Sequence, residues 1–206
     1  KLFMTDTGGH YLEGSTDITR TVALGEVGNL EKEHFTLVAR AMLRLANTVF
    51  LYGCSGANLD CIAREIFWKE GLNFNHGTGH GVGYLLNIHE GPINFRWKEG
   101  ERPAPALEEN MVITDEPGIY IEGSHGIRLE NELLVRKTVK NEYGQFMNFE
   151  ILTYVPIDLD AILPEKMSTE EKEMLNHYHK QVYEKVSPYL SEEERIWLKE
   201  YTRAVK

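Results

Sequence analysis

Three histidines lie among glycines in one short part of the chain, where residues 76–83 read His-Gly-Thr-Gly-His-Gly-Val-Gly and residues 89–92 read His-Glu-Gly-Pro. Glycines let a backbone approach a ligand closely, and imidazoles bind metal ions or exchange protons near neutral pH. We therefore expect His76, His80 and His89 to contact a metal or a substrate. His125 stays open, and the histidines without such a motif are expected to be structural: His10, His34, His177 and His179.

Four carboxylates stand in separate motifs. Asp6 and Asp17 lie on two predicted strands that a hairpin would bring together, so both can point into one site. Glu116 follows an apolar run, where an acidic side chain is costly unless something compensates it. Strand alternation puts Arg128 and Glu130 on one face. Two other readings stay open, a turn-capping role for Asp6 and an exposed ion pair between Arg128 and Glu130.

A metal site would explain why these carboxylates converge. Without a cation, four carboxylates repel one another and some stay protonated, whereas two divalent ions balance them. Oxygen-rich ligation with one imidazole suits Mn²⁺ and related ions better than a cysteine-rich zinc site. Two such ions can lower the pKa of a water between them and polarise a carbonyl. The residues therefore predict a site for two metal ions.

The hydrophobic pattern predicts the elements that must carry these residues. Strands over 2–6 and 18–24 form the hairpin. A long helix capped by Asn29 buries one face, and a second helix over 58–70 ends before Gly71. The apolar face of the long helix comprises Phe35, Val38, Met42, Leu45 and Val49. Short β-rich runs follow at 111–114, 118–121, 127–129, 132–135 and 149–155. We expect an α+β fold with a curved, mainly antiparallel sheet and flanking helices.

The last part of the chain has a different pattern. From residue 156 onward, capping boxes at Ser168 and Ser191 predict two helices separated near Pro188. A helical segment of this size is too small for a large core of its own. We therefore divide the chain into a catalytic domain over 1–158 and a helical extension over 159–206.

The composition and net charge of the chain narrow the classes of molecule that it is expected to bind. The chain has 206 residues, 42% of them hydrophobic, and a net charge of -10. An acidic protein of this kind is not expected to bind nucleic acid or an anionic membrane. Cys54 and Cys61 match neither a zinc motif nor a disulfide framework and are expected to be reduced. The sequence lacks a signal peptide and an apolar run of membrane length, so we expect a cytoplasmic protein. Because it starts at Lys1 within a strand-like run, we expect an excised piece.

Taken together, the motifs resemble those of the pita-bread metallopeptidases, and among these the Xaa-Pro aminopeptidases. The resemblance is most specific at 76–83, 89–92, 114–118 and 126–131, and it continues through 152–158 into the helical tail. It implies a pita-bread fold that lacks its N-terminal part. It also implies a five-residue metal-ligand set: Asp6, Asp17, His80, Glu116 and Glu130.

The resemblance further implies a role for each residue. Asp6 would bind one ion, His80 and Glu116 the other, and Asp17 and Glu130 would bridge them. Glu116 would also accept the proton of the attacking water. His76 and His89 would contact the substrate and steady the tetrahedral intermediate. Arg128 and Tyr120 would lie either behind the metal ligands, as their hydrogen-bond partners, or beside the bound peptide.

The activity that the resemblance implies is hydrolysis of the bond between an N-terminal residue and a following proline, with two ions, most plausibly Mn²⁺. The substrates would be peptides with proline at the second position, and the intact protein would form a homodimer. We expect this chain alone to have little activity. The alternatives are a prolidase-type Xaa-Pro dipeptidase and a pita-bread module that binds peptides or proteins without catalysis.

Overall fold

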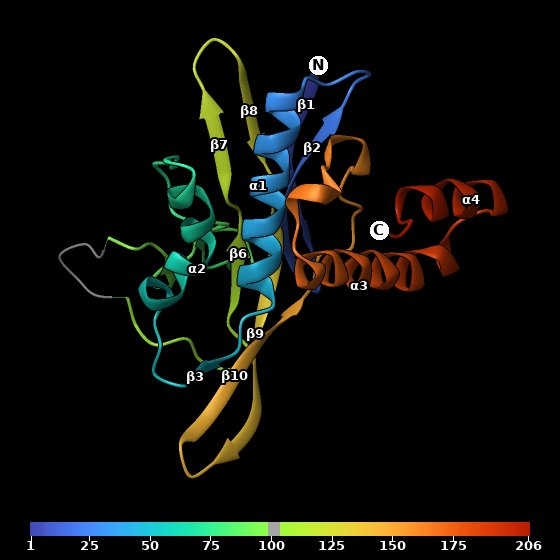
Figure 1. Ribbon diagram of the computed structural model, residues 1–206. Helices are drawn as coiled ribbons and strands as arrows, with labels where there is room; N and C mark the ends of the chain where they lie inside the picture. Colours follow the sequence, from blue (N-terminus) through green and yellow to red (C-terminus); the bar gives the residue numbers. More distant parts are fainter. Residues whose placement is uncertain (99–103) are drawn as a thin grey trace.

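A long antiparallel hairpin begins the chain in the computed structural model, which describes residues 1–98 and 104–206 (Figure 1). Strands β1 (Leu2–Tyr11) and β2 (Gly14–Ala23) pair so that Asp6 lies opposite Thr19 and Asp17 opposite Gly8. The predicted hairpin is confirmed, with longer strands than expected. Because alternate residues share a face, both aspartates lie on the same side of the hairpin.

The larger sheet combines three strands from the second half of the chain with β3 from the first half. Its four strands run in the order β3, β10, β9, β6. Two short hairpins accompany it, and every strand pairing among the described residues is antiparallel. The strands are β3 (Phe50–Leu51), β4 (Gly79–His80), β5 (Asn94–Phe95), β6 (Val112–Asp115), β7 (Gly118–Ile121), β8 (His125–Arg128), β9 (Asn131–Asn141) and β10 (Gly144–Ile151). The expected curved, mainly antiparallel sheet with flanking helices is confirmed.

One strand prediction was wrong in its bounds. The run 149–155 was expected to be a strand, but β10 covers Gly144–Ile151. Beyond it, the carbonyls of Val155 and Pro156 accept hydrogen bonds from the side chain of Arg20, so this backbone does not continue the sheet. β3, β4 and β5 were not predicted, because two-residue strands carry no readable periodicity.

Helices α1 (Asn29–Ala46) and α2 (Gly56–Lys69) lie against the sheet (Figure 1). Two details of the α1 prediction were wrong. Gly28 is the N-cap, while Asn29 is the first helical residue and bonds Glu33 through its side chain. Val49 is 63% exposed, because α1 ends at Ala46. The other predicted residues of that face are buried: Phe35, Val38, Met42 and Leu45.

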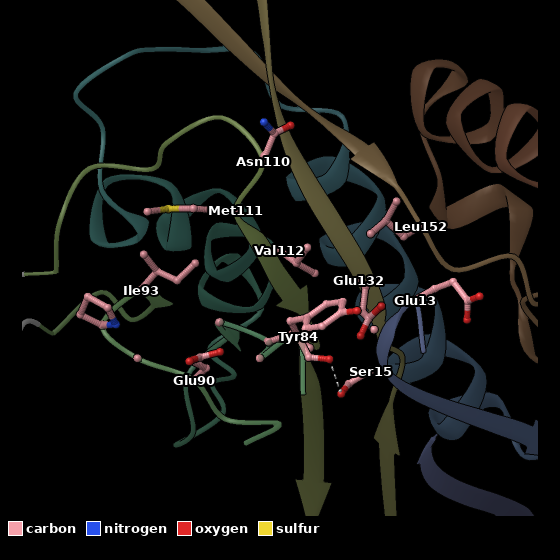
Figure 2. Close-up of a pocket in the computed structure, with 16 residues that line it drawn as sticks. Glu13, Ser15, Tyr84, Glu90, Ile93, Asn110, Met111, Val112, Glu132 and Leu152 are labelled. Carbon is pink, nitrogen blue, oxygen red and sulfur yellow. Dashed lines mark hydrogen bonds between the residues drawn. The ribbon is translucent and has the colours of Figure 1, made fainter. Parts of the chain in front are cut away.

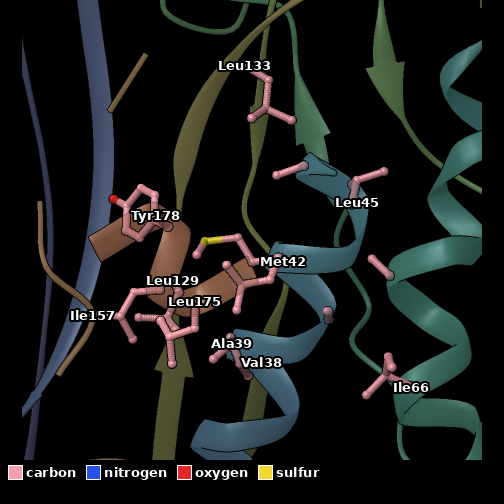
Figure 3. Packing of buried hydrophobic residues seen from close by; sticks show 14 of the residues in the cluster. Val38, Ala39, Met42, Leu45, Ile66, Leu129, Leu133, Ile157, Leu175 and Tyr178 are labelled. Atoms are coloured by element: carbon pink, nitrogen blue, oxygen red, sulfur yellow. The ribbon is translucent and has the colours of Figure 1, made fainter. Parts of the chain in front are cut away.

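The C-terminal residues form α3 (Thr169–Val186) and α4 (Glu192–Tyr201), with short 3₁₀ turns at Leu159–Ala161, Pro164–Lys166 and Ser187–Tyr189. Both predicted capping boxes are present, at Ser168 and Ser191. Leu175 and Tyr178 of α3 enter the core beside α1 (Figure 3). Within the described residues, no helix is both long and apolar enough to cross a membrane. The division at residue 158 stays a prediction.

Candidate metal centre

Three predicted ligands from distant parts of the chain meet at one point. One ligand atom each from Asp17, His80 and Glu130 lies within 4.8 Å of the other two. Asp17 comes from β2, His80 from β4, and Glu130 from the connection between β8 and β9. Glu130 is 1% exposed. The fold thus places an imidazole and two carboxylates where one ion could contact all of them.

The imidazole of His80 has the orientation of a metal ligand. Its Nδ1 lies 3.0 Å from the carbonyl oxygen of Gly81, so Nδ1–H donates there and Nε2 keeps its lone pair. Nε2 is 3.4 Å from Oε1 of Glu116 and 3.6 Å from Oδ2 of Asp17. Glu116 therefore joins the cluster as a fourth ligand candidate.

Two threonine hydroxyls orient the two glutamates. Thr19 Oγ1 donates to Oε2 of Glu130 over 2.6 Å. Thr114 Oγ1 accepts the backbone N–H of His80 over 3.0 Å and donates to Oε1 of Glu116 over 3.3 Å. Neither threonine was predicted as a site residue. Thr19 lies on β2 two positions after Asp17, and Thr114 lies on β6 two positions before Glu116, and this spacing was the available signal.

Asp6 lies at the edge of the site. Its side chain is 51% exposed and accepts a hydrogen bond from Nη2 of Arg128 over 2.6 Å. Arg128 also lies 3.8 Å from Glu116 and donates through Nε to Thr19 Oγ1 over 3.1 Å. Among the described residues, its carboxylate partners are Asp6 and Glu116. The alternative ion pair between Arg128 and Glu130 is not formed.

Burial and the crowding of the carboxylates raise their pKa values. Burial, with the charges of Glu116 and Asp17, raises the pKa of Glu130 to about 9. Burial, with the charge of Asp17 among others, raises the pKa of Glu116 to about 7 despite Arg128. Burial and the charge of Asp6 also raise the pKa of Asp17. Together with the preset imidazole, this donor set fits divalent cations, which would supply the missing positive charge.

The residues expected to serve a substrate surround this cluster. The ring of His89 lies 4.1 Å from that of His80, and the ring of His76 lies 5.4 Å from that of Tyr120, centre to centre. The hydroxyl of Tyr120 accepts from Nη1 of Arg128 over 3.1 Å. His76 donates through Nδ1 to its neighbour's carbonyl, while its buried Nε2 bonds to none of the described residues. Burial lowers the pKa of His76.

A buried ion pair that we did not predict fixes the histidine loop. Asp60 and Arg64 of α2 are paired over 2.6 Å, with side chains 0% and 2% exposed. Arg64 donates to the carbonyl oxygens of Phe74 and His76 over 2.7 and 2.6 Å. Asp60 accepts the hydroxyl hydrogen of Thr78 and the backbone N–H of Trp97. This pair holds the glycine-rich backbone that carries His76 and leads to β4.

A cavity of about 470 Å³ is lined in part by Gly81, the residue that follows the predicted ligand His80 (Figure 2). Glu132 lines it, and Oε1 of Glu132 accepts the backbone N–H of Asp17 over 2.9 Å. Burial raises the pKa of Glu132 to about 7. Ser15, Tyr84 and Val112 also line the cavity. Glu132 was missed as a site residue, although it stands two positions after Glu130 in the sequence.

Comparison with known protein families gives two matches. Residues 1–137 match metallopeptidase family M24, and residues 145–205 match the C-terminal region of peptidase M24. A curated protein of Paracoccidioides brasiliensis (strain Pb03), named probable Xaa-Pro aminopeptidase P, is 40% identical over 209 residues. That alignment covers 99% of this chain and 34% of the relative, so the chain spans about a third of the relative's length.

Solved structures agree with these matches. The X-prolyl aminopeptidase of Caenorhabditis elegans, described as a cytosolic enzyme with a di-nuclear active site, superposes with a TM-score of 0.92 at 38% identity. The match covers 99% of this chain and 34% of that one. The Xaa-Pro dipeptidase of Bacillus anthracis gives a TM-score of 0.60 at 34% identity, over 76% of this chain and 40% of that one. The expected pita-bread fold is confirmed, and the chain belongs to metallopeptidase family M24.

Proposed function

We propose that this chain carries the dinuclear metal centre of an aminopeptidase that hydrolyses the bond between an N-terminal residue and a following proline. The observation that carries the proposal is the meeting of Asp17, His80 and Glu130 within 4.8 Å, with Glu116 beside His80. The similarity to Xaa-Pro aminopeptidases over 99% of the chain supports the choice of reaction.

In this proposal five residues hold two divalent ions, for which we propose Mn²⁺: Asp6, Asp17, His80, Glu116 and Glu130. When bound, the ions would activate a water molecule and polarise the scissile carbonyl. Glu116, which lies 3.4 Å from Nε2 of His80 and 3.8 Å from Arg128, would accept the proton of the attacking water and return it. Two observations support divalent cations at this site: the carboxylates are crowded together, and His80 directs the lone pair of Nε2 toward them.

The other side chains would bind and orient the peptide. Nε2 of His76 is a buried polar atom without a partner among the described residues and would be available for a substrate hydrogen bond. The ring of His89 lies edge-on to that of His80. Arg128 and Tyr120 bond to each other next to Asp6 and Glu116, and this position supports a role beside the substrate. These groups would steady the tetrahedral intermediate and hold the reacting peptide in position.

A prolidase-type dipeptidase is the second candidate, because the Bacillus anthracis Xaa-Pro dipeptidase shares the fold over 76% of this chain. The aminopeptidase is preferred since the Caenorhabditis elegans enzyme matches 99% of the chain, with the C-terminal helices included. A non-catalytic binding module is disfavoured because three of the five predicted ligands, Asp17, His80 and Glu130, meet within 4.8 Å. We further propose a cytoplasmic location, as in that cytosolic relative, and a homodimer for the intact protein.

The first test is Mn²⁺ binding to this chain, measured by calorimetry and elemental analysis. We expect about two ions per chain. Asp17→Asn should lose specific binding, because a bridging ligand contacts both ions. Asp160→Asn, at a 68% exposed carboxylate outside the cluster, is the matched control and should bind as the original chain does. Absence of specific binding in the original chain would contradict the proposal.

Substrate length separates the two enzymes. An aminopeptidase cleaves a tripeptide of the form Xaa-Pro-Xaa, whereas a dipeptidase cleaves only the Xaa-Pro dipeptide. We expect the tripeptide to be the better substrate, with low turnover by this chain. Preference for the dipeptide would favour the prolidase-type enzyme instead.

A further inference from the structure

The guanidinium of Arg20 lies at the junction of the hairpin, the ligand-bearing connection and the C-terminal region. Arg20 is 5% exposed and has no carboxylate partner among the described residues. A buried charge of this kind is costly unless polar groups surround it. Its hydrogen bonds go to the backbone oxygens of Thr19, Glu130, Val155 and Pro156, to Oδ1 of Asn131 and to the hydroxyl of Tyr178.

Two of these bonds reach Glu130, which is proposed to bridge the two ions, and its neighbour Asn131. Nη1 of Arg20 donates to the carbonyl oxygen of Glu130 over 2.5 Å, and Nη2 donates to Asn131 over 2.7 Å. On the hairpin side, the backbone N–H of Glu130 donates to the carbonyl oxygen of Thr19 over 3.0 Å. The backbone of Glu130 is therefore held from both of its polar groups.

Tyr178 provides the other end of this connection. It is 1% exposed on α3, and its hydroxyl accepts from Arg20 over 2.8 Å and donates to the carbonyl oxygen of Val155 over 2.7 Å. Figure 3 shows its ring in the core near Leu175 and Ile157. A hydroxyl with these partners fixes where the guanidinium can lie.

We propose that Arg20 and Tyr178 are positioning residues through which helix α3 fixes the backbone of Glu130, so that the C-terminal region forms part of the metal centre. The inference rests on the proposed function, since it assumes that Glu130 is a bridging ligand. It differs from ordinary docking of α3, because α3 also bonds α1 through Arg40 and Glu171, over 2.9 Å, without touching the ligand set.

The test compares two pairs of conservative substitutions in the full chain. Arg20→Lys and Tyr178→Phe remove bonds of the connection. Arg40→Lys and Tyr183→Phe are the matched controls, because Arg40 also bonds α3 and Tyr183 lies on α3 at the edge of the core. Circular dichroism first establishes that all four variants are folded.

The first readout is hydrogen exchange of the Glu130 and Asn131 amides in the metal-free chain. We expect faster exchange there in Arg20→Lys and Tyr178→Phe, and unchanged exchange in both controls. The second readout is Mn²⁺ binding, which should weaken about 10- to 100-fold in Arg20→Lys and less in Tyr178→Phe. A bridge that is displaced should also weaken the magnetic coupling of the two Mn²⁺ ions in the electron paramagnetic resonance spectrum.

Unchanged exchange at Glu130 in Arg20→Lys would overturn the inference, and so would equal effects in Arg20→Lys and Arg40→Lys. Because exchange is measured without metal, its result holds whether or not the original chain binds Mn²⁺. If the original chain binds no Mn²⁺ but exchange at Glu130 responds as expected, the proposed function fails while the positioning by Arg20 and Tyr178 is supported.

Discussion

Single hydroxyl groups determine how the glutamates of this site are presented. The hydroxyl of Thr19 accepts a hydrogen bond from Arg128 and donates one to Glu130. One oxygen atom therefore connects the guanidinium to a carboxylate that is predicted to bind metal. Thr114 performs the same function between the backbone of His80 and Glu116. Hydrogen-bonded partners of this kind fix ligand orientation and raise metal affinity.

The substitution Thr19→Val should therefore weaken Mn²⁺ binding about 10- to 100-fold, because it removes the hydroxyl and leaves a side chain of nearly the same shape. The matched control is Thr21→Val, which also removes a fully buried hydroxyl from β2. Among the described residues, the Thr21 hydroxyl bonds only the backbone of Arg128 and none of the carboxylates predicted to bind metal. Calorimetry on both variants measures the effect, and equal Mn²⁺ affinity in the two would show that Thr19 does not orient Glu130.

At the scale of elements, helix α2 contributes both to the hydrophobic core and to the position of the histidine loop. Its Leu59 and Ile66 enter the core, while Asp60 and Arg64 hold the loop with His76. Removing one partner of a buried pair leaves an uncompensated charge, which costs far more than loss of an exposed pair. The loop and the helix should therefore lose stability together.

The substitution Arg64→Met should lower the free energy of unfolding by about 3–5 kcal/mol. Arg136→Met breaks the exposed pair with Glu150, whose side chains are 43% and 49% exposed, and should cost less than about 1 kcal/mol. Urea unfolding of both variants provides the measurement. A similar loss in both would mean that Asp60 and Arg64 contribute no more than a surface pair.

The chemical motifs could be predicted from the sequence better than the supports around them. His80 and Glu116 stand in specific motifs, and the register of Asp6 and Asp17 follows from a simple hairpin. Asp60 and Arg64 could not be recognised, because a pair four residues apart on a helix is usually solvated. Their burial depends on residues brought near by tertiary folding, among them Phe74 and Thr78.

At the scale of the whole molecule, helix α3 is joined to the rest of the chain through buried polar contacts. His179 of α3 is fully buried and accepts the backbone N–H of Ile157 over 3.0 Å. Burial lowers the pKa of His179 to about 4. The same segment bonds Arg20, so these few residues connect α3 to the sheet.

The low pKa of His179 makes the stability of the chain depend on pH. Between the ordinary histidine pKa near 6.5 and about 4, only the unfolded chain binds this proton, so stability falls as the pH falls through that range. The loss should reach about 3 kcal/mol near pH 4. Urea unfolding of the original chain and of His179→Gln at several pH values tests this. An unchanged pH dependence in His179→Gln would contradict it.

The hairpin β1–β2 brings Asp6 and Asp17 to predicted ligands that lie far away in the sequence. Thr19 of the same hairpin, for example, bonds Glu130, which stands 111 positions later. Ions shared between these side chains would act as a removable cross-link that closes a very long loop, comparable in effect to a disulfide. Because a ligand that binds only the folded state stabilises it according to its concentration, free metal would set how tightly the first strands are held. A chelator would then loosen the contact between the hairpin and the segment around Glu130 without breaking a covalent bond.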